Sequence, residues 1–188
     1  NNWKWTTVGD LMVGKPQSGT SQKPNSDRRG VPVLRMGNIQ DGELDLTNLK
    51  HVDLRRAEAE RYRLQKGDLV FNRTNSAELV GKTAVFESDE PAVCASYLIR
   101  FRVDLERVVP RFVSFYINSP LGRKYVGSQL VRAIGQVNVN AQKLSSMPIP
   151  VPSTLREQED VAKHMLHVRA EVREMSTVQS ENATLFND

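Results

Sequence analysis

Side chains that carry paired hydrogen-bond donors and acceptors gather in four short segments, together with basic side chains. The first two are the run 16–30 and the stretch around Arg35; the others are 72–82 and 132–140. Amide and guanidinium groups can bond two atoms of a base edge at once, whereas lysine suits phosphates. The segments therefore indicate loops that contact DNA. The candidate residues are Ser18, Thr20, Lys23, Arg35, Asn38, Arg73, Asn75, Ser76, Lys82, Arg132, Gln136, Asn138 and Asn140.

Each segment also has a simpler interpretation that the sequence leaves open. The run 16–30 has the composition of an ordinary surface loop. Arg35 could form an ion pair with an acidic side chain in 41–43, because these residues follow it closely. Asn138 and Asn140 could be turn residues that bond their own backbone.

Catalytic and metal-binding patterns are weak in this sequence. The acids Asp41, Glu43 and Asp45 with Lys50 form the closest set that could hold Mg²⁺, but alternating acids in a turn are more typical of a solvated surface. The three histidines do not cluster with Cys94, so a zinc site is not expected. A glycine-rich cofactor turn and the Pro-Pro-aromatic motif of adenine methyltransferases are also missing. We expect no catalytic residue, no metal and no cofactor.

Composition and charge set the class of protein. The 188 residues suit one domain with an appended element, and their apolar share of 39% is that of a globular protein. No apolar run approaches the length of a membrane helix, and the first residues do not resemble a secretory signal, which predicts a cytoplasmic protein. Bases exceed acids in 1–40 and 100–143, whereas acids exceed bases in 41–60 and 154–188. Two basic stretches could therefore meet on one surface that faces phosphates.

Short strands and helices alternate up to about residue 152. Runs rich in β-branched and aromatic residues predict strands at 31–36, 68–72, 83–86 and 95–102. Helix signals, including prolines in first turns, predict helices at 55–62, 110–118 and 120–131. The spacing is too short for repeated parallel crossovers. We expect an α+β fold with a curved, mainly antiparallel sheet or partial barrel.

A long helix follows the prolines of 147–152, which favour an extended strut. From a cap at Ser153 or Thr154, about 30 residues contain no Gly or Pro, which divides the chain into a body, 1–152, and a helix, 153–188. Apolar residues recur at alternating steps of four and three, as in a coiled coil. This stripe either packs on its own domain or pairs with a partner helix. It consists of Val161, Met165, Val168, Val172 and Met175.

Nine fragments along nearly the whole chain, in this order and spacing, carry a family resemblance. They are Trp5–Asp10, Gly19–Thr20, Val31–Ile39, Asp41–Gly42, Leu64–Ser76, Val80–Lys82, Val137–Asn140, Met147–Pro152 and Glu157–Gln158. With them, the sequence resembles the specificity subunits of type I restriction-modification systems. It departs from that family in having one recognition domain and one spacer helix where two of each are usual, and Ser21 where proline is more familiar.

The resemblance implies a non-catalytic DNA-recognition module that reads one half of a split sequence in the major groove. The implied partners are double-stranded DNA, methyltransferase subunits that dock on the helix and, as a further candidate, a restriction subunit. A single recognition half also implies pairing through the helix, either with a second copy or with the other half of a longer subunit. An interaction protein that acts through its helix without reading DNA is the alternative function.

Overall fold

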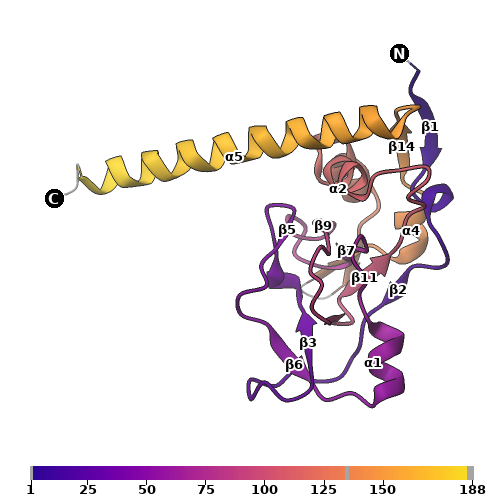
Figure 1. Cartoon of the computed structure of the whole chain (residues 1–188), viewed down its shortest axis with the longest axis vertical. Coiled ribbons are helices and arrows are strands. Elements are labelled where there is room, and N and C mark those ends of the chain that lie inside the picture. The colour runs from indigo at the N-terminus through magenta and orange to yellow at the C-terminus, as the bar shows by residue number, and fades with distance from the viewer. Residues whose placement is uncertain (1, 134–135, 186–188) are drawn as a thin grey trace.

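The computed structural model describes residues 2–133 and 136–185, which fold into an α+β body from which one long helix projects (Figure 1). The body combines short sheets with short helices, and α5 (Leu155–Leu185) runs along one edge of it and continues beyond it. The α+β class and the long helix agree with the prediction from sequence. No described helix combines the length and the apolar character that crossing a bilayer requires.

A four-stranded antiparallel sheet forms the centre of the body, in the order β2–β11–β7–β9. Its strands are β2 (Gln17–Ser18), β7 (Leu69–Asn72), β9 (Thr83–Val85) and β11 (Leu98–Phe101). Side chains of β7 alternate between two apolar clusters, with Leu69 and Phe71 on one face and Val70 on the other. Burial on both faces explains why β7 has a continuous apolar sequence. This sheet supports the loops that carry the candidate residues.

Smaller sheets surround the central one without closing into a barrel, so the expected partial barrel is not what forms. Their ladders are mainly antiparallel, but β10 pairs with β3 in parallel. Because these strands are only two to four residues long, each ladder ends after a few pairs. The strands are β3 (Val31–Leu34), β4 (Ile39–Gln40), β5 (Glu43–Leu44), β6 (Lys50–Val52), β8 (Thr74–Asn75), β10 (Val93–Cys94), β12 (Val131–Ala133) and β13 (Gln136–Asn138).

The helices of the body begin and end near the expected residues. Pro110 opens α2, and Pro120 opens α3 after Ser119, whose hydroxyl accepts a hydrogen bond from the Gly122 amide at 3.3 Å. The helix expected at 120–131 stops earlier, because the chain turns into β12 and pairs with β13. The α-helices are α1 (Arg56–Tyr62), α2 (Pro110–Asn118), α3 (Pro120–Ser128) and α4 (Ala141–Ser145), with 3₁₀ turns η1 (Gly9–Leu11) and η2 (Met36–Asn38).

The proline-rich strut is the edge partner of the first strand. It forms β14 (Pro148–Val151), antiparallel to β1 (Lys4–Thr7), with Trp5 opposite Pro150. An edge strand tolerates proline because only one of its sides needs donors for a ladder. The strut therefore joins the start of the chain to the base of α5, where the Thr154 hydroxyl accepts from the Glu157 amide at 3.2 Å as a helix cap.

Candidate nucleic-acid interface

Loops from four parts of the chain meet around η2. A hollow of about 410 Å³ is lined from the first loop by Thr20 and Lys23, and from β3 onward by Arg35, Met36 and Gly37. A second hollow of about 350 Å³ shares the last two of these residues. We call this surface the η2 face. The residues that define it are Thr20, Lys23, Arg35, Met36, Gly37, Asn75, Lys82 and Tyr97.

Arg73 connects the loop after β7 to the first loop of the chain. Its Nη1 donates to the Ser18 hydroxyl at 3.0 Å, and its amide donates to the Tyr97 carbonyl at 3.0 Å. Its Nε is buried and has no hydrogen-bond partner among the described residues. Two candidate residues that are 55 positions apart therefore form one contact, and Arg73 links the loop after β7 to the segments of Ser18 and Tyr97.

The third and fourth candidate segments form one small sheet. Strand β13 pairs with both β12 and β8, which places Val137 opposite Asn75. The Asn138 Nδ2 donates to the Thr74 hydroxyl at 2.6 Å, so this amide holds the two strands together. Gln136 is exposed at the start of β13. The side chain of Arg132, on β12, lies outside the described part of the structure.

The polar groups of three further candidates serve the fold itself. Asn38 is only 6% exposed, and its side chain accepts from the Arg35 amide at 2.8 Å and donates to the Asp45 carbonyl at 3.0 Å. Thr20 is 4% exposed and accepts from the Gln22 amide. The Asn140 side chain caps α4 by accepting from the Lys143 amide at 2.9 Å. The polar groups of these three side chains are therefore engaged within the fold.

Asn75 ends β8, and Ser76 follows it directly, ahead of the turn 77–81. The Ser76 amide donates to the Asn75 Oδ1 at 2.8 Å, which leaves the two donors of the Asn75 amide available for a base. Ser76 is exposed, and Lys82 is half-buried beside Asn75 in the same hollow. An amide donor and a lysine side chain thus lie in one hollow.

Tyr97 is a residue of this face that the sequence analysis did not single out. It lies within the strand expected at 95–102, but β11 begins only at Leu98, because 95–97 form a turn in which the Leu98 amide donates to the Ala95 carbonyl. The turn leaves Tyr97 47% exposed beside Thr20 and Arg35. An aromatic ring there offers a flat apolar surface to a base or a thymine methyl group. A run of Ala-Ser-Tyr before the apolar residues was the available signal.

The motif Gly19–Thr20 lies where two segments of backbone come very close together. The Thr20 amide donates to the Cys94 carbonyl at 2.8 Å, where the end of β2 meets β10. A Cβ atom on Gly19 would lie 1.8 Å from that carbonyl oxygen. Only glycine fits there, and it brings the first loop onto the η2 face.

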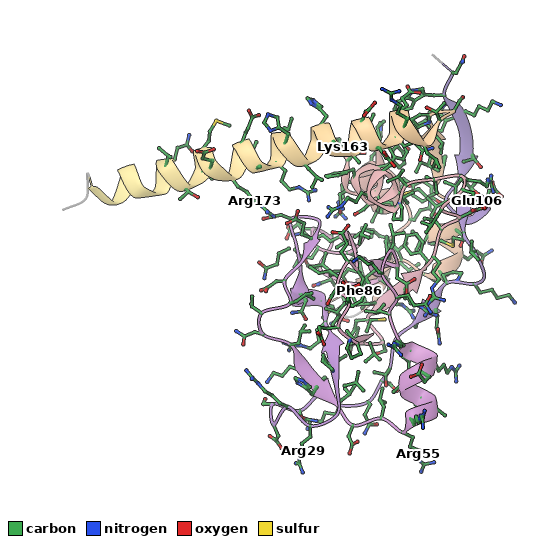
Figure 2. The ribbon with its side chains drawn as sticks, in the orientation of Figure 1. Arg29, Arg55, Phe86, Glu106, Lys163 and Arg173 are labelled. Atoms are coloured by element: carbon green, nitrogen blue, oxygen red, sulfur yellow. The ribbon has the colours of Figure 1, made fainter. Side chains whose placement is uncertain are left out.

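The β4–β5 hairpin holds α5 against the body. Glu43 pairs with Arg173 at 3.0 Å and with Arg169 at 3.5 Å, and the guanidinium of Arg169 lies 4.6 Å from the centre of the Phe115 ring. Figure 2 shows Arg173 on the side of α5 that faces the body. Burial lowers the pKa of Arg169, and Glu43 opposes that shift. Glu43 is therefore paired with α5, and among the described residues it forms no ion pair with Arg35.

The acids considered as metal ligands are also used within the fold. Glu43 binds α5, and the Asp45 carboxylate accepts from the Thr47 amide and hydroxyl, which lowers its pKa. In the described part of the chain, no three His, Cys, Asp or Glu residues are grouped to hold a metal ion. Burial raises the pKa of the Cys94 thiol to about 12, so at neutral pH it is no nucleophile.

The stripe of α5 is covered only near the start of the helix. Val161 packs against the main apolar cluster and Val168 is half-buried, whereas Val172 and Met175 are 51% and 57% exposed. Met165 is 40% exposed. Figure 1 shows that α5 extends beyond the body. The apolar side chains of its outer part, Val172 and Met175, therefore remain exposed.

The arrangement is that of a binding module: polar and basic side chains are presented from loops on a stiff sheet, and a helix projects from the same body. One family model matches nearly the whole chain. The chain belongs to the family of type I restriction modification DNA specificity domains, whose model matches residues 1–176.

Relatives with curated descriptions agree with this assignment. The chain is 30% identical over 175 residues to a putative type I restriction enzyme MjaX specificity subunit from Methanocaldococcus jannaschii, covering 86% of this chain and 41% of the relative. It is 26% identical over 159 residues to the EcoKI specificity subunit of Escherichia coli, covering 83% and 34%. The chain therefore spans between a third and two fifths of these relatives' length.

Solved structures show the same fold. One is described as the structural basis underlying complex assembly and conformational transition of the type I R-M system; it matches with a TM-score of 0.69 at 17% identity, over 96% of this chain and 41% of that chain. The HsdS subunit from Thermoanaerobacter tengcongensis matches with a TM-score of 0.64 at 15% identity, over 94% and 40%.

Proposed function

We propose that this chain reads one half of a bipartite sequence in double-stranded DNA, from the major groove, as the specificity component of a type I restriction-modification system. In this proposal DNA methyltransferase subunits dock on α5 and carry out the chemistry, with a restriction subunit as a further partner. The chain supplies no catalytic group. The family membership supports the proposal. We assign the reading to side chains of the η2 face, because polar and basic groups from separate loops meet there.

The observation that carries this function is the meeting of separate polar loops on one face. Lys23, Arg35 and Lys82 supply positive charge for phosphates, whereas Asn75 and the exposed ring of Tyr97 suit base edges. Base-specific contacts need such groups on a rigid support, because specificity depends on placing donors and acceptors within hydrogen-bond reach. The central sheet provides that support.

Selection from a random duplex library tests the function directly. The chain, with its methyltransferase subunits, should enrich a defined half-sequence and should lose affinity steeply as salt rises. Enrichment of no sequence, together with stable binding of the methyltransferase, would instead favour an interaction protein that acts through α5.

Mutation should distinguish residues that contact phosphates from residues that contact bases. Lys82→Ala should weaken binding to all duplexes alike, because phosphate contacts carry no sequence information. Asn75→Ala and Gln136→Ala should mainly reduce discrimination between the selected sequence and random DNA, by about 1–3 kcal/mol for a good base contact. Fluorescence anisotropy with both duplexes measures the difference.

Lys66→Ala, an exposed lysine of the body that pairs with Asp89 outside the η2 face, is the matched control and should change neither affinity. Equal loss of affinity for every duplex in the Asn75 and Gln136 variants would refute the base-reading assignment.

We also propose that the exposed stripe of α5 pairs with a second long helix, from another copy of this chain or from the other half of a subunit. Apolar side chains at coiled-coil spacing favour a helix as the partner. A helix of 31 residues at 1.5 Å per residue is about 46 Å long, which exceeds one DNA turn of about 34 Å. Paired helices could therefore hold two recognition domains on separate half-sites.

Charges in the stripe should prevent this pairing. Val168→Asp with Val172→Asp buries carboxylates in a helix interface, so the double variant is expected to be monomeric by light scattering while the body keeps its far-ultraviolet circular dichroism. Lys163→Asp with Ala170→Asp, on the opposite side of α5, should pair like the unaltered chain. An unchanged mass for the stripe variant at every concentration would count against helix-mediated pairing.

A further inference from the structure

A groove beside the η2 face carries a cluster of positive charge that base reading does not use. It has a volume of about 570 Å³ and is lined by Arg28, Arg35 and Lys50 together with His51. Of the described residues that line it, none is Asp or Glu. Two acids adjoin lining residues in sequence, and both are engaged: Asp27 pairs with Arg29 at 2.8 Å, and the Asp45 carboxylate accepts from the Thr47 amide and hydroxyl. Three cations without a carboxylate create a local positive potential that attracts an anion.

Separate elements bring these side chains together. Strand β6 carries Lys50 and His51, and it pairs with β3 so that Lys50 lies opposite Val33; Arg35 directly follows β3. The loop 26–30 contributes Ser26 and Arg28 to the lining, and Lys50 donates to the Ser26 hydroxyl. The groove is therefore built on two paired strands.

Several polar groups of the groove residues lack partners within the described chain. The Arg35 Nε and the His51 Nδ1 are buried and form no hydrogen bond. Such atoms are uncommon in folded proteins, and a water molecule or an ion is one explanation for them. Arg28 also has a φ of 56°, a left-handed conformation that is unfavourable for a residue with a Cβ atom. Strained backbone is concentrated at ligand sites.

We propose that this groove binds a backbone phosphate of the DNA duplex that flanks the bases read from the η2 face. Arg35 lines both the groove and the η2 face, so the two surfaces are continuous. DNA lying on the η2 face would extend its backbone over Arg28 and Lys50. The guanidinium and ammonium groups would each donate to phosphate oxygens. This inference rests on the proposed function. It assigns part of the sequence-independent affinity for DNA to Arg28, Arg35 and Lys50.

Salt dependence of binding to a random-sequence duplex tests the groove. The logarithm of affinity falls against the logarithm of salt concentration by about 0.9 for each phosphate contact. Lys50→Gln is expected to reduce this slope by about one contact, and Lys50→Arg to restore it. Arg28→Gln, on an exposed loop, is the second variant and should reduce the slope in the same way. The ratio of affinities for the selected and random duplexes should stay unchanged, because a flanking phosphate carries no sequence information.

Lys66→Gln is the matched control: Lys66 pairs with Asp89 at 3.1 Å, outside the groove, and its loss should leave the slope unchanged. If the unaltered chain with its methyltransferase subunits binds no duplex, the proposed function fails. If it binds and both groove variants keep the full slope, the function stands and the groove assignment fails.

Thermal unfolding with inorganic phosphate tests whether the groove binds small anions instead of the DNA backbone. Suppose that phosphate raises the melting temperature of the unaltered chain but not of Lys50→Gln, while the salt slope of DNA binding is the same for both. This result would overturn the assignment to the duplex. Binding of a glutamate-rich peptide that DNA does not displace would do so as well, since the groove would then be a protein-docking surface.

Discussion

Asp68→Ala should lower the free energy of unfolding by about 3 kcal/mol, because removing one partner leaves buried charge without compensation. The Asp68 carboxylate is 1% exposed, accepts from the Arg102 Nε at 2.6 Å and lies 3.9 Å from Arg100. It also accepts from the Gln65 amide at 2.9 Å. Burial and the neighbouring Arg102 already lower the pKa of Arg100, whereas Asp68 opposes that shift. Urea denaturation measures the change.

A surface pair provides the control for this effect. Asp89→Ala removes the partner of Lys66, and both side chains are more than 60% exposed, so the expected change is at most about 1 kcal/mol. Similar losses for Asp68→Ala and Asp89→Ala would show that burial of the Asp68 carboxylate does not control its contribution.

Gln158→Leu should detach the base of α5 from the body. Gln158 is 1% exposed; its Oε1 accepts from the Val109 amide at 2.8 Å, and its Nε2 donates to the carbonyls of Arg107 and Pro152, each at 3.1 Å. Leucine has a similar size but cannot replace these bonds, and each buried backbone group left without a partner costs about 1–3 kcal/mol. We expect a loss of at least about 2 kcal/mol in urea denaturation.

Hydrogen exchange gives this prediction a local readout. The Val109 amide should exchange faster in Gln158→Leu, because its acceptor is gone. Gln179→Leu, an exposed glutamine on the same helix, is the matched control and should leave Val109 protected. Unchanged exchange at Val109 in the Gln158 variant would contradict the assigned role.

The helix α5 is attached to the body at two places. Gln158 fixes the start of α5, and Glu43 binds Arg169 and Arg173 further along. The hairpin that carries Glu43 turns through Asp41 and Gly42, both with positive φ, and follows η2 directly. A Cβ atom on Gly42 would lie 2.9 Å from the Arg169 guanidinium. The η2 face and α5 are therefore joined by one short hairpin.

Local signals in the sequence predicted most of the regular elements. Prolines at 110 and 120 located the starts of α2 and α3, because a fixed φ and a missing amide are tolerated in a first turn. A continuous apolar run located β7, and the stretch free of Gly and Pro located α5. The order of short motifs also identified the family. These features depend on a few neighbouring residues.

The tertiary structure decided which candidate side chains have free groups. Asn38, Asn75 and Asn138 have the same side chain, yet the first amide is buried, the second keeps its donors, and the third joins two strands. Gln158 appeared in the sequence only as part of a motif, and its role depends on backbone groups about 50 residues away. The hydrogen-bond partners of a polar side chain are set by chain segments distant in sequence. Composition and spacing could therefore single out candidate loops but could not tell which of their polar groups are free and which are engaged in the fold.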